Sequence, residues 1–139
     1  MYDILHATPD VQTYISLRAS AGLHSVTPEA ARIGLANTLF AVQIALSSSP
    51  DTIIGMGRMV GDGGCFFLLT DMAVLPDHQG KGVGKIIMKE LKAWMDKNVP
   101  ASGVVLLHAD GPAKYLYKQF GFVETANFPI PSIGMACEY

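Results

Sequence analysis

A length of 139 residues fits a single domain with one hydrophobic core. Half of the residues are hydrophobic, 16% are charged and the formal net charge is -2. This composition excludes a disordered chain and argues against a general nucleic-acid binder. We therefore expect one domain spanning residues 1–139, with no nucleic-acid partner.

The cysteines and the N-terminal residues bear on location. Cys65 and Cys137 lie far apart and form no CxxC pair, so we expect reduced residues of the core or of strands. The first residues have neither the basic region nor the apolar core of a signal peptide, and no window approaches the roughly 18 apolar residues of a membrane span. These features predict a cytoplasmic protein without membrane association.

The first part of the chain predicts one strand and two helices. A short strand is expected at residues 2–7. The Thr-Pro-Asp segment 8–10 predicts a helix start with a threonine cap, proline at the first helical position and an acid in the first turn. Apolar residues at helical spacing extend this helix to Ala21. The Thr-Pro-Glu segment 27–29 starts a second helix, which ends at about Asn37.

Residues 38–75 predict a meander of three antiparallel strands. Apolar side chains alternate in residues 38–46 and 52–60, as they do in half-buried strands. The segment 65–75 is apolar on both faces, so we expect it at the centre of the sheet. Ser, Pro, Asp and Gly residues form the turns between these strands.

The remaining residues predict two helices and three strands. Apolar residues repeat at helical spacing in residues 86–95. Residues 103–109 form a short strand, parallel to the previous one if the helix is a crossover. A second helix is expected at 112–121, and residues 122–125 and 133–138 supply two closing strands. The predicted fold is a mixed α/β (α+β) sheet in the order β-α-α-β-β-β-α-β-α-β-β.

The segment PDHQGKGVGK, residues 76–85, joins the apolar strand to the following helix. Glycines and lysines at a helix start indicate an anion site, because the first helical turn has unpaired N–H groups and a partial positive charge. A Walker loop would require Ser or Thr after Lys85, where Ile86 stands. The dinucleotide fingerprint would require Gly-x-Gly-x-x-Gly in a doubly wound fold, whereas this segment has Gly-x-Gly-x-Gly after a meander.

The spacing Gln79-x-x-Gly82-x-Gly84 resembles the pyrophosphate loop of the GNAT superfamily of acetyl-CoA-dependent acyltransferases. Residues 113–122, AKYLYKQFGF, are similar to that family's Ala-x-x-x-Tyr-x-x-x-Gly-Phe element. The order of elements agrees as well, so the resemblance covers nearly the whole chain. It implies the GNAT acyl-CoA N-acyltransferase fold, with acetyl-CoA as co-substrate and no metal.

The resemblance also implies which residues bind the cofactor. Backbone groups of the central strand would hydrogen-bond the pantetheine arm, and N–H groups of residues 80–85 would hold the pyrophosphate. Glycine suits the loop because a Cβ would block close approach of phosphate oxygens. The family often has asparagine at the position of Asp110, and an ionised carboxylate cannot donate to pantetheine carbonyls. The expected cofactor-binding residues are Met72, Ala73, Val74, Gln79, Gly80, Lys81, Gly82, Val83, Gly84, Lys85, Asp110, Ala113, Lys114 and Tyr117.

Two catalytic tasks can be assigned through the resemblance. Tyr117, four residues before Gly121, would protonate the thiolate leaving group, since a phenol with a pKa of about 10 can donate a proton at neutral pH. Tyr115 shows that tyrosines occur in this segment in any case. A backbone N–H near Met72 or Ala73 would stabilise the oxyanion.

The general base is open between several interpretations. Asp71 is the leading candidate, because a carboxylate in so apolar a strand is costly unless it is paired or functional. Alternatively, Asp71 is a satisfied carboxylate that holds the splay of the strand or a neighbouring loop. His108 ends a strand and could relay a proton or be structural.

The acceptor is expected to contact the first two helices and the C-terminal segment. Tyr14, Arg18, His24 and residues 128–131 could form its pocket, but they make no diagnostic constellation. We favour a small-molecule primary amine, such as an amino sugar, polyamine or arylalkylamine, attacking directly in a ternary complex. Protein N-terminal or lysine acetylation, a non-catalytic acyl-CoA sensor and a different acyl-CoA donor are the alternatives. The apolar, proline-containing C-terminal segment is consistent with a homodimer.

Overall fold

The computed structural model describes all 139 residues, which form two compact units, Met1–Leu107 and His108–Tyr139. The first contains β1 (Tyr2–Leu5), α1 (Val11–Ser20), α2 (Pro28–Ala36), β2 (Phe40–Leu46), β3 (Ser49–Gly61), β4 (Phe66–Val74), a short 3-10 helix (Pro76–His78), α3 (Val83–Asn98) and β5 (Val104–Leu106). The second contains α4 (Ala113–Lys118) and a 3-10 helix at Thr125–Asn127.

The first unit is built on a five-stranded sheet in the order β1-β2-β3-β4-β5. The first four strands are antiparallel, and β5 pairs in parallel with β4 after the α3 crossover. The predicted mixed α/β class, the meander and the parallel crossover are therefore confirmed. The expectation that segment 65–75 lies at the sheet's centre is wrong, because only the short β5 lies outside β4 and β3 is the middle strand.

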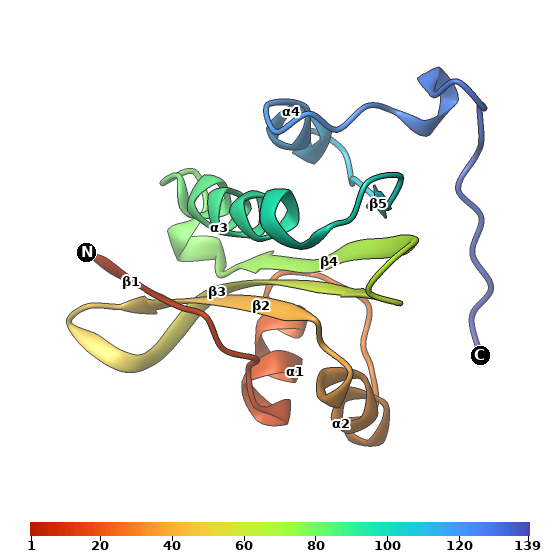
Figure 1. Cartoon of the computed structure of the whole chain (residues 1–139). Helices are drawn as coiled ribbons and strands as arrows, with labels where there is room; N and C mark the ends of the chain where they lie inside the picture. The colour runs from red at the N-terminus through yellow and green to blue at the C-terminus, as the bar shows by residue number, and fades with distance from the viewer. The chain divides into compact units, whose positions relative to one another are not determined.

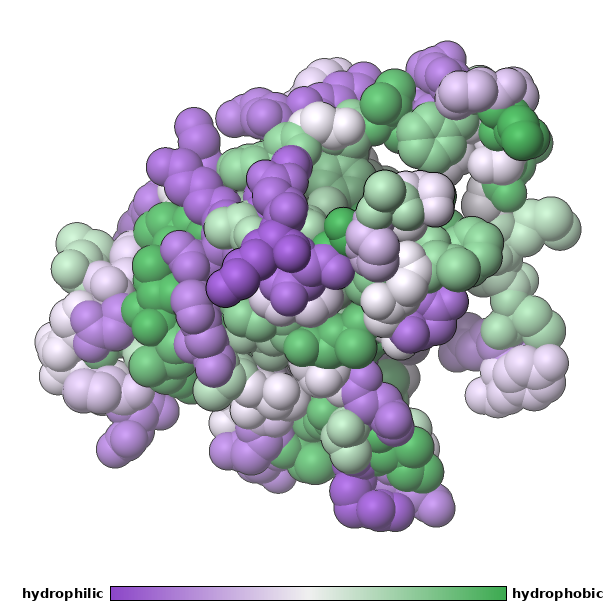
Figure 2. Space-filling model, viewed as in Figure 1, coloured by the Kyte–Doolittle hydropathy of each residue, from purple (hydrophilic) through white to green (hydrophobic).

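Helices cover both faces of this sheet (Figure 1). On one face, α3 buries Val83, Ile87, Met88 and Leu91 at helical spacing. On the other face, α1 and α2 pack Tyr14, Leu17, Ala31 and Leu35 against Met56 and Ala73 of the sheet. Figure 2 shows hydrophilic side chains spread over the outer surface where α3 lies, as expected for an amphipathic helix. No helix in the structure combines the length and hydropathy that a membrane span needs.

The two N-terminal helices begin at side-chain caps. Thr27 caps α2 as predicted, since its Oγ1 accepts the Ala30 N–H at 3.1 Å. The prediction that Thr8 caps α1 is wrong. Asp10 is the cap, and its Oδ1 accepts the Thr13 N–H at 2.8 Å. Aspartate caps at least as well as threonine, so α1 begins two residues later than expected.

The predicted closing strands at 122–125 and 133–138 are absent from the structure. The second unit contains no strand with which they could pair. Instead, Thr125 Oγ1 donates to the Ser132 carbonyl at 3.0 Å and the Ser132 N–H donates to the Thr125 carbonyl at 3.2 Å. These bonds close a loop rather than a sheet.

The cysteines are free, but the expectation that they belong to the core or to strands is wrong, because both are exposed and neither lies in a strand. Cys65 lies in the turn between β3 and β4. Its N–H is one of three that Asp62 Oδ1 accepts, at 2.8–3.1 Å. These hydrogen bonds lower the pKa of Asp62, so its contribution to stability is present above the ordinary range near pH 4 and is lost as pH falls through the lowered value.

Candidate functional site

A β-bulge interrupts β4 in its second half. In the pairing of β3 with β4, Gly57 alone lies opposite two residues, Asp71 and Met72. Asp71 has a φ of +59°, in the left-handed region that few non-glycine residues adopt. Because a bulge bends the strand and redirects its backbone groups, β4 changes direction beside Met72, near which the resemblance implies the oxyanion donor.

Beyond its first three residues, β4 has one edge without a strand partner. β5 pairs only with residues 66–68, so residues 69–74 present this edge without a sheet ladder. An edge of this kind can hydrogen-bond an extended ligand in the way that it would bind an added strand.

In an antiparallel ladder, the backbone groups of successive residues point alternately to the two sides of the strand, and this alternation shows which groups of β4 point to the free edge. The Leu75 N–H donates to the Ile54 carbonyl at 2.9 Å, so Leu75 faces β3. Two residues earlier, Ala73 also faces β3, whereas the backbone groups of Met72 and Val74 face the free edge. Of the two predicted oxyanion donors, this alternation favours Met72.

The loop after β4 leads into the N-terminus of α3. Gly80 and Gly82 have φ of +72° and +82°, and no atom lies within 4 Å of the position where a Cβ would stand on either residue. The first intrahelical bond runs from the Ile86 N–H to the Gly82 carbonyl at 3.1 Å, so the N–H groups of residues 83–85 lack helical partners. This open backbone at the positive end of a helix dipole suits an anion.

The side chains of the loop have different environments. Lys81 and Lys85 are exposed, where they can add positive charge, while the Val83 side chain is buried in the core beneath α3. The Gln79 side-chain amide donates to the Val74 carbonyl at 2.9 Å. Gln79 therefore ties the loop to the end of β4, and its predicted role at the pyrophosphate stays a prediction.

The Asp71 carboxylate is buried, with 7% of the residue exposed, and it accepts from three side chains. Tyr14 Oη and Arg58 Nε each donate to Oδ2 at 2.9 Å, and Arg18 Nη1 donates to Oδ1. Every buried side-chain polar atom of the protein has a partner. These contacts favour the second interpretation of Asp71, a satisfied carboxylate that holds the strand.

Tyr14 and Arg18 were candidates for the wall of the acceptor pocket, but both are buried and donate to Asp71. Burial raises the pKa of Tyr14 first, and the negative charge of Asp71 raises it further. The phenol therefore stays protonated as a donor. Arg18 also donates to the His24 carbonyl from Nη2 at 2.7 Å, so His24 belongs to the same network.

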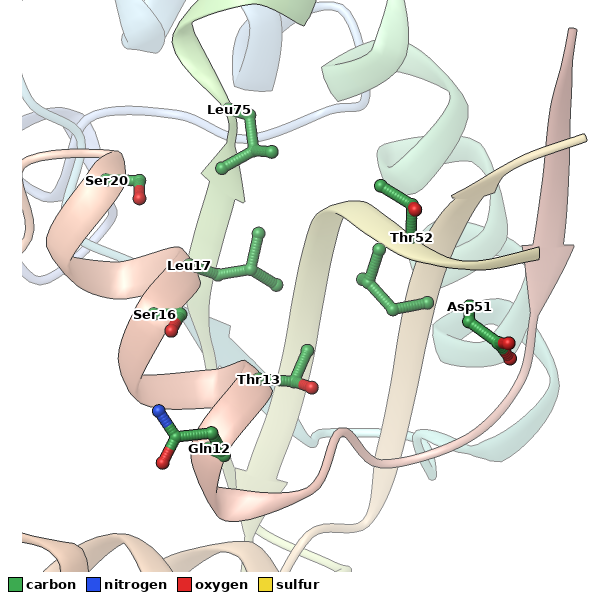
Figure 3. A pocket seen from close by; sticks show the side chains of 9 residues that line it. Gln12, Thr13, Ser16, Leu17, Ser20, Asp51, Thr52 and Leu75 are labelled. Carbon is green, nitrogen blue, oxygen red and sulfur yellow. The ribbon is translucent and has the colours of Figure 1, made fainter. Parts of the chain in front are cut away.

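A groove of about 420 Å³ lies between α1 and the start of β3 (Figure 3). No sequence motif indicates this groove, although the polar residues at positions 12, 13, 16 and 20 share one side of α1, away from Tyr14 and Arg18. The groove is lined by Gln12, Thr13, Ser16, Leu17, Ser20, Asp51, Thr52, Ile53 and Leu75.

In the second unit, burial distinguishes the two tyrosines of α4. Tyr117 is 7% exposed and packs edge-to-face on Phe122, with ring centroids 6.3 Å apart, whereas Tyr115 is 62% exposed. Burial raises the pKa of Tyr117, and the negative charge of Asp110 raises it further. The phenol of Tyr117 is therefore protonated at neutral pH, as a proton donor must be.

The other predicted residues of the second unit lie around the start of α4. The Asp110 carbonyl accepts the Ala113 N–H at 3.0 Å, and Lys114 Nζ lies 3.6 Å from Glu124 Oε1. The predicted site residues thus fall into two groups, one in each unit. That the two groups form one cleft stays a prediction from the resemblance.

The structure and the comparisons identify the class of protein. A mixed sheet whose strand β4 leads into a glycine loop and a helix N-terminus matches the arrangement that the resemblance to acyl-CoA-dependent acyltransferases predicted. A family model described as acetyltransferase (GNAT) domain matches residues 37–124. The chain belongs to the GNAT acetyltransferase family. No curated protein matches the chain.

Several solved structures are similar over the full chain. A probable acetyltransferase of unknown function from meticillin-resistant Staphylococcus aureus is 39% identical, with 100% of both chains covered and a TM-score of 0.90. A GNAT-family acetyltransferase from Streptococcus pneumoniae is 21% identical, with 100% of both chains covered and a TM-score of 0.76. Glucosamine-6-phosphate N-acetyltransferase from Arabidopsis thaliana is 16% identical, covering 100% of this chain and 99% of its own, with a TM-score of 0.68. The last two likenesses show the fold alone.

Proposed function

We propose that this acetyltransferase transfers the acetyl group of acetyl-CoA to a primary amine of a small molecule, by direct attack in a ternary complex. The observation that carries the proposal is the continuous path from the bulge at Asp71, along the free edge of Met72 and Val74, to the open loop at the start of α3. Backbone donors and acceptors of the edge would hold the pantetheine arm. The N–H groups of residues 83–85 would hold the pyrophosphate.

In the proposed reaction, a neutral amine attacks the thioester carbonyl that acetyl-CoA supplies. The Met72 N–H donates to the oxygen on which negative charge develops. As the C–S bond breaks, Tyr117 donates its phenolic proton to the departing sulfur, and the surplus proton that the attacking nitrogen then loses passes through solvent and restores the phenol. Because Asp71 is already bound to three donors, we assign deprotonation of the incoming ammonium to water rather than to Asp71.

We place the small-molecule acceptor in the groove beside α1, which reaches Leu75 just beyond the end of β4. Its volume of about 420 Å³ lies within the range typical of small-molecule sites. Hydroxyl groups and the single carboxylate of Asp51 suit a hydroxylated amine or a polyamine. No aromatic side chain lines the groove, so among the predicted acceptors an arylalkylamine fits least well.

A thiol-release assay with acetyl-CoA over a panel of amino sugars, polyamines, arylalkylamines and peptides tests this proposal. We expect turnover with at least one amino sugar or polyamine. Turnover with peptides alone would instead support protein N-terminal or lysine acetylation. Binding of acetyl-CoA without turnover on any amine would support a sensor. The cytoplasmic location and a homodimeric state stay predictions from the sequence.

The phosphate-binding role of the loop predicts that Gly82→Ala weakens CoA binding by about tenfold or more, because a Cβ would enter the open cradle. Isothermal titration with CoA measures the effect. Gly63→Ala is a matched control, since Gly63 has the same φ of +82° and the same open surroundings in the β3–β4 turn. Both variants should lose a similar stability, about 1 kcal/mol, from strain at positive φ. Equal CoA affinity in the two variants would contradict the proposed role.

A further inference from the structure

We propose that Arg18 and Arg58 are positioning residues that act through Asp71 to set the direction of the Met72 N–H. This inference rests on the proposed function, in which that N–H stabilises the oxyanion. It gives the buried network a role in the reaction, although none of its side chains touches substrate.

The backbone of Asp71 is held in a conformation that it would otherwise leave. A φ of +59° is unfavourable for residues with a side chain, although aspartate tolerates it better than most. Such conformations persist where the surrounding structure over-determines them. Around Asp71, the only polar groups in contact with the carboxylate are the three donors from Tyr14, Arg18 and Arg58.

Both guanidinium groups are themselves anchored at a second point. Arg58 Nη1 donates at 3.0 Å to the Gly34 carbonyl and at 3.0 Å to Thr38 Oγ1. Arg18 donates to the His24 carbonyl from Nε at 3.2 Å and from Nη2 at 2.7 Å. The carboxylate is thus tied to α1, to β3, to the end of α2 and to the segment between α1 and α2. It cannot shift without breaking contacts in more than one element.

The position of Asp71 fixes the next peptide group. The ψ of Asp71 and the φ of Met72 orient the peptide plane that carries the Met72 N–H. While Asp71 stays in the left-handed region, the strand keeps its extra residue, and the Met72 N–H faces the free edge. If the carboxylate is released, β4 can relax toward an ordinary strand, and this N–H loses its direction.

Arg58→Lys tests the inference, because lysine keeps the charge but cannot reach Asp71, Gly34 and Thr38 together. The matched control is Arg32→Lys, which changes an exposed arginine of α2 in the same way. Amide resonances of ¹⁵N-labelled protein are recorded with CoA and with acetyl-CoA. In wild type and in Arg32→Lys, we expect the Met72 amide proton to move downfield with acetyl-CoA relative to CoA. In Arg58→Lys, we expect this difference to disappear while both ligands bind within threefold of wild type.

Thiol release gives a second reading with the same variants. We expect kcat of Arg58→Lys to fall tenfold or more, with KM for acetyl-CoA within threefold and an unchanged shape of the pH profile. An unaltered Met72 response in a folded Arg58→Lys protein would overturn the inference. A shift of the acidic limb of the pH–rate profile in Arg58→Lys would instead indicate that Asp71 is the general base. If wild type fails to bind acetyl-CoA, the proposed function fails, whereas the ligand-free Met72 amide shift and exchange rate still test the network. Should Arg58→Lys not fold, Arg18→Lys gives the same test without altering β3.

Discussion

Tyr117→Phe is expected to lower kcat by about 10²–10⁴-fold while acetyl-CoA binding stays close to that of wild type. The substitution removes only the phenolic hydroxyl, so the thiolate would have to leave without a proton. The ring can still pack edge-to-face on Phe122, and we therefore expect little change in stability.

The pKa of Tyr117 makes the expected pH dependence specific. Burial and the charge of Asp110 raise this pKa above its ordinary value near 10, so the acid form persists through neutral and mildly alkaline pH. Any loss of activity caused by ionisation of Tyr117 should therefore set in at a higher pH than the ionisation of an ordinary tyrosine would cause. The linked stability has the same sign, since it is fully present below the unfolded pKa and is lost as pH rises through the folded pKa.

Tyr115→Phe is the matched control for this prediction. It removes the same hydroxyl two residues earlier, from a side chain that is 62% exposed and lies near the ammonium groups of Lys114 and Lys118. We expect wild-type kcat. Thiol-release kinetics and CoA titration on both variants separate turnover from binding. Full activity in Tyr117→Phe, or equal losses in the two variants, would contradict the acid role.

Sequence predicted those parts of the site that depend on neighbours along the chain. The glycine loop follows its strand and starts its helix within residues 76–85, and Tyr117, which the resemblance singled out, is the buried tyrosine of α4 whereas Tyr115 is exposed. The prediction of two closing strands was wrong, because a strand needs a pairing neighbour that the local sequence pattern does not reveal. The second unit contains no strand that could serve as this neighbour.

The sequence indicated the network around Asp71 only indirectly, through one residue that does not fit its apolar surroundings. A carboxylate within an apolar strand indicated a partner or a function. Its partners Arg18 and Tyr14, however, are 53 and 57 residues away in the sequence. The bulge also depends on the register between β3 and β4, which alternation of apolar residues does not specify where both faces are buried.

Asp71→Asn is expected to lower the free energy of unfolding by about 3–5 kcal/mol, because it leaves two buried guanidinium charges without a counter-ion. Arg18 and Arg58 are only 5% and 9% exposed, so solvent screens these charges weakly. Asparagine has nearly the same shape and tolerates positive φ, so the variant changes charge more than geometry. Urea unfolding at neutral pH measures the loss, and a change of less than about 1 kcal/mol would place the network among weak surface ion pairs.

A triple variant, Asp71→Asn with Arg18→Met and Arg58→Met, separates stability from function. Leaving charges of a buried ion network uncompensated costs far more than removing every charge of it, so we expect this variant to recover part of the stability lost in Asp71→Asn alone. The anchors that hold the bulge would still be missing, so turnover should remain low although the protein is stable. Recovery of both stability and turnover would show that the ion network serves the fold alone. Recovery of stability without turnover would show that the charges of Arg18, Arg58 and Asp71 are needed where the strand is redirected, at Met72.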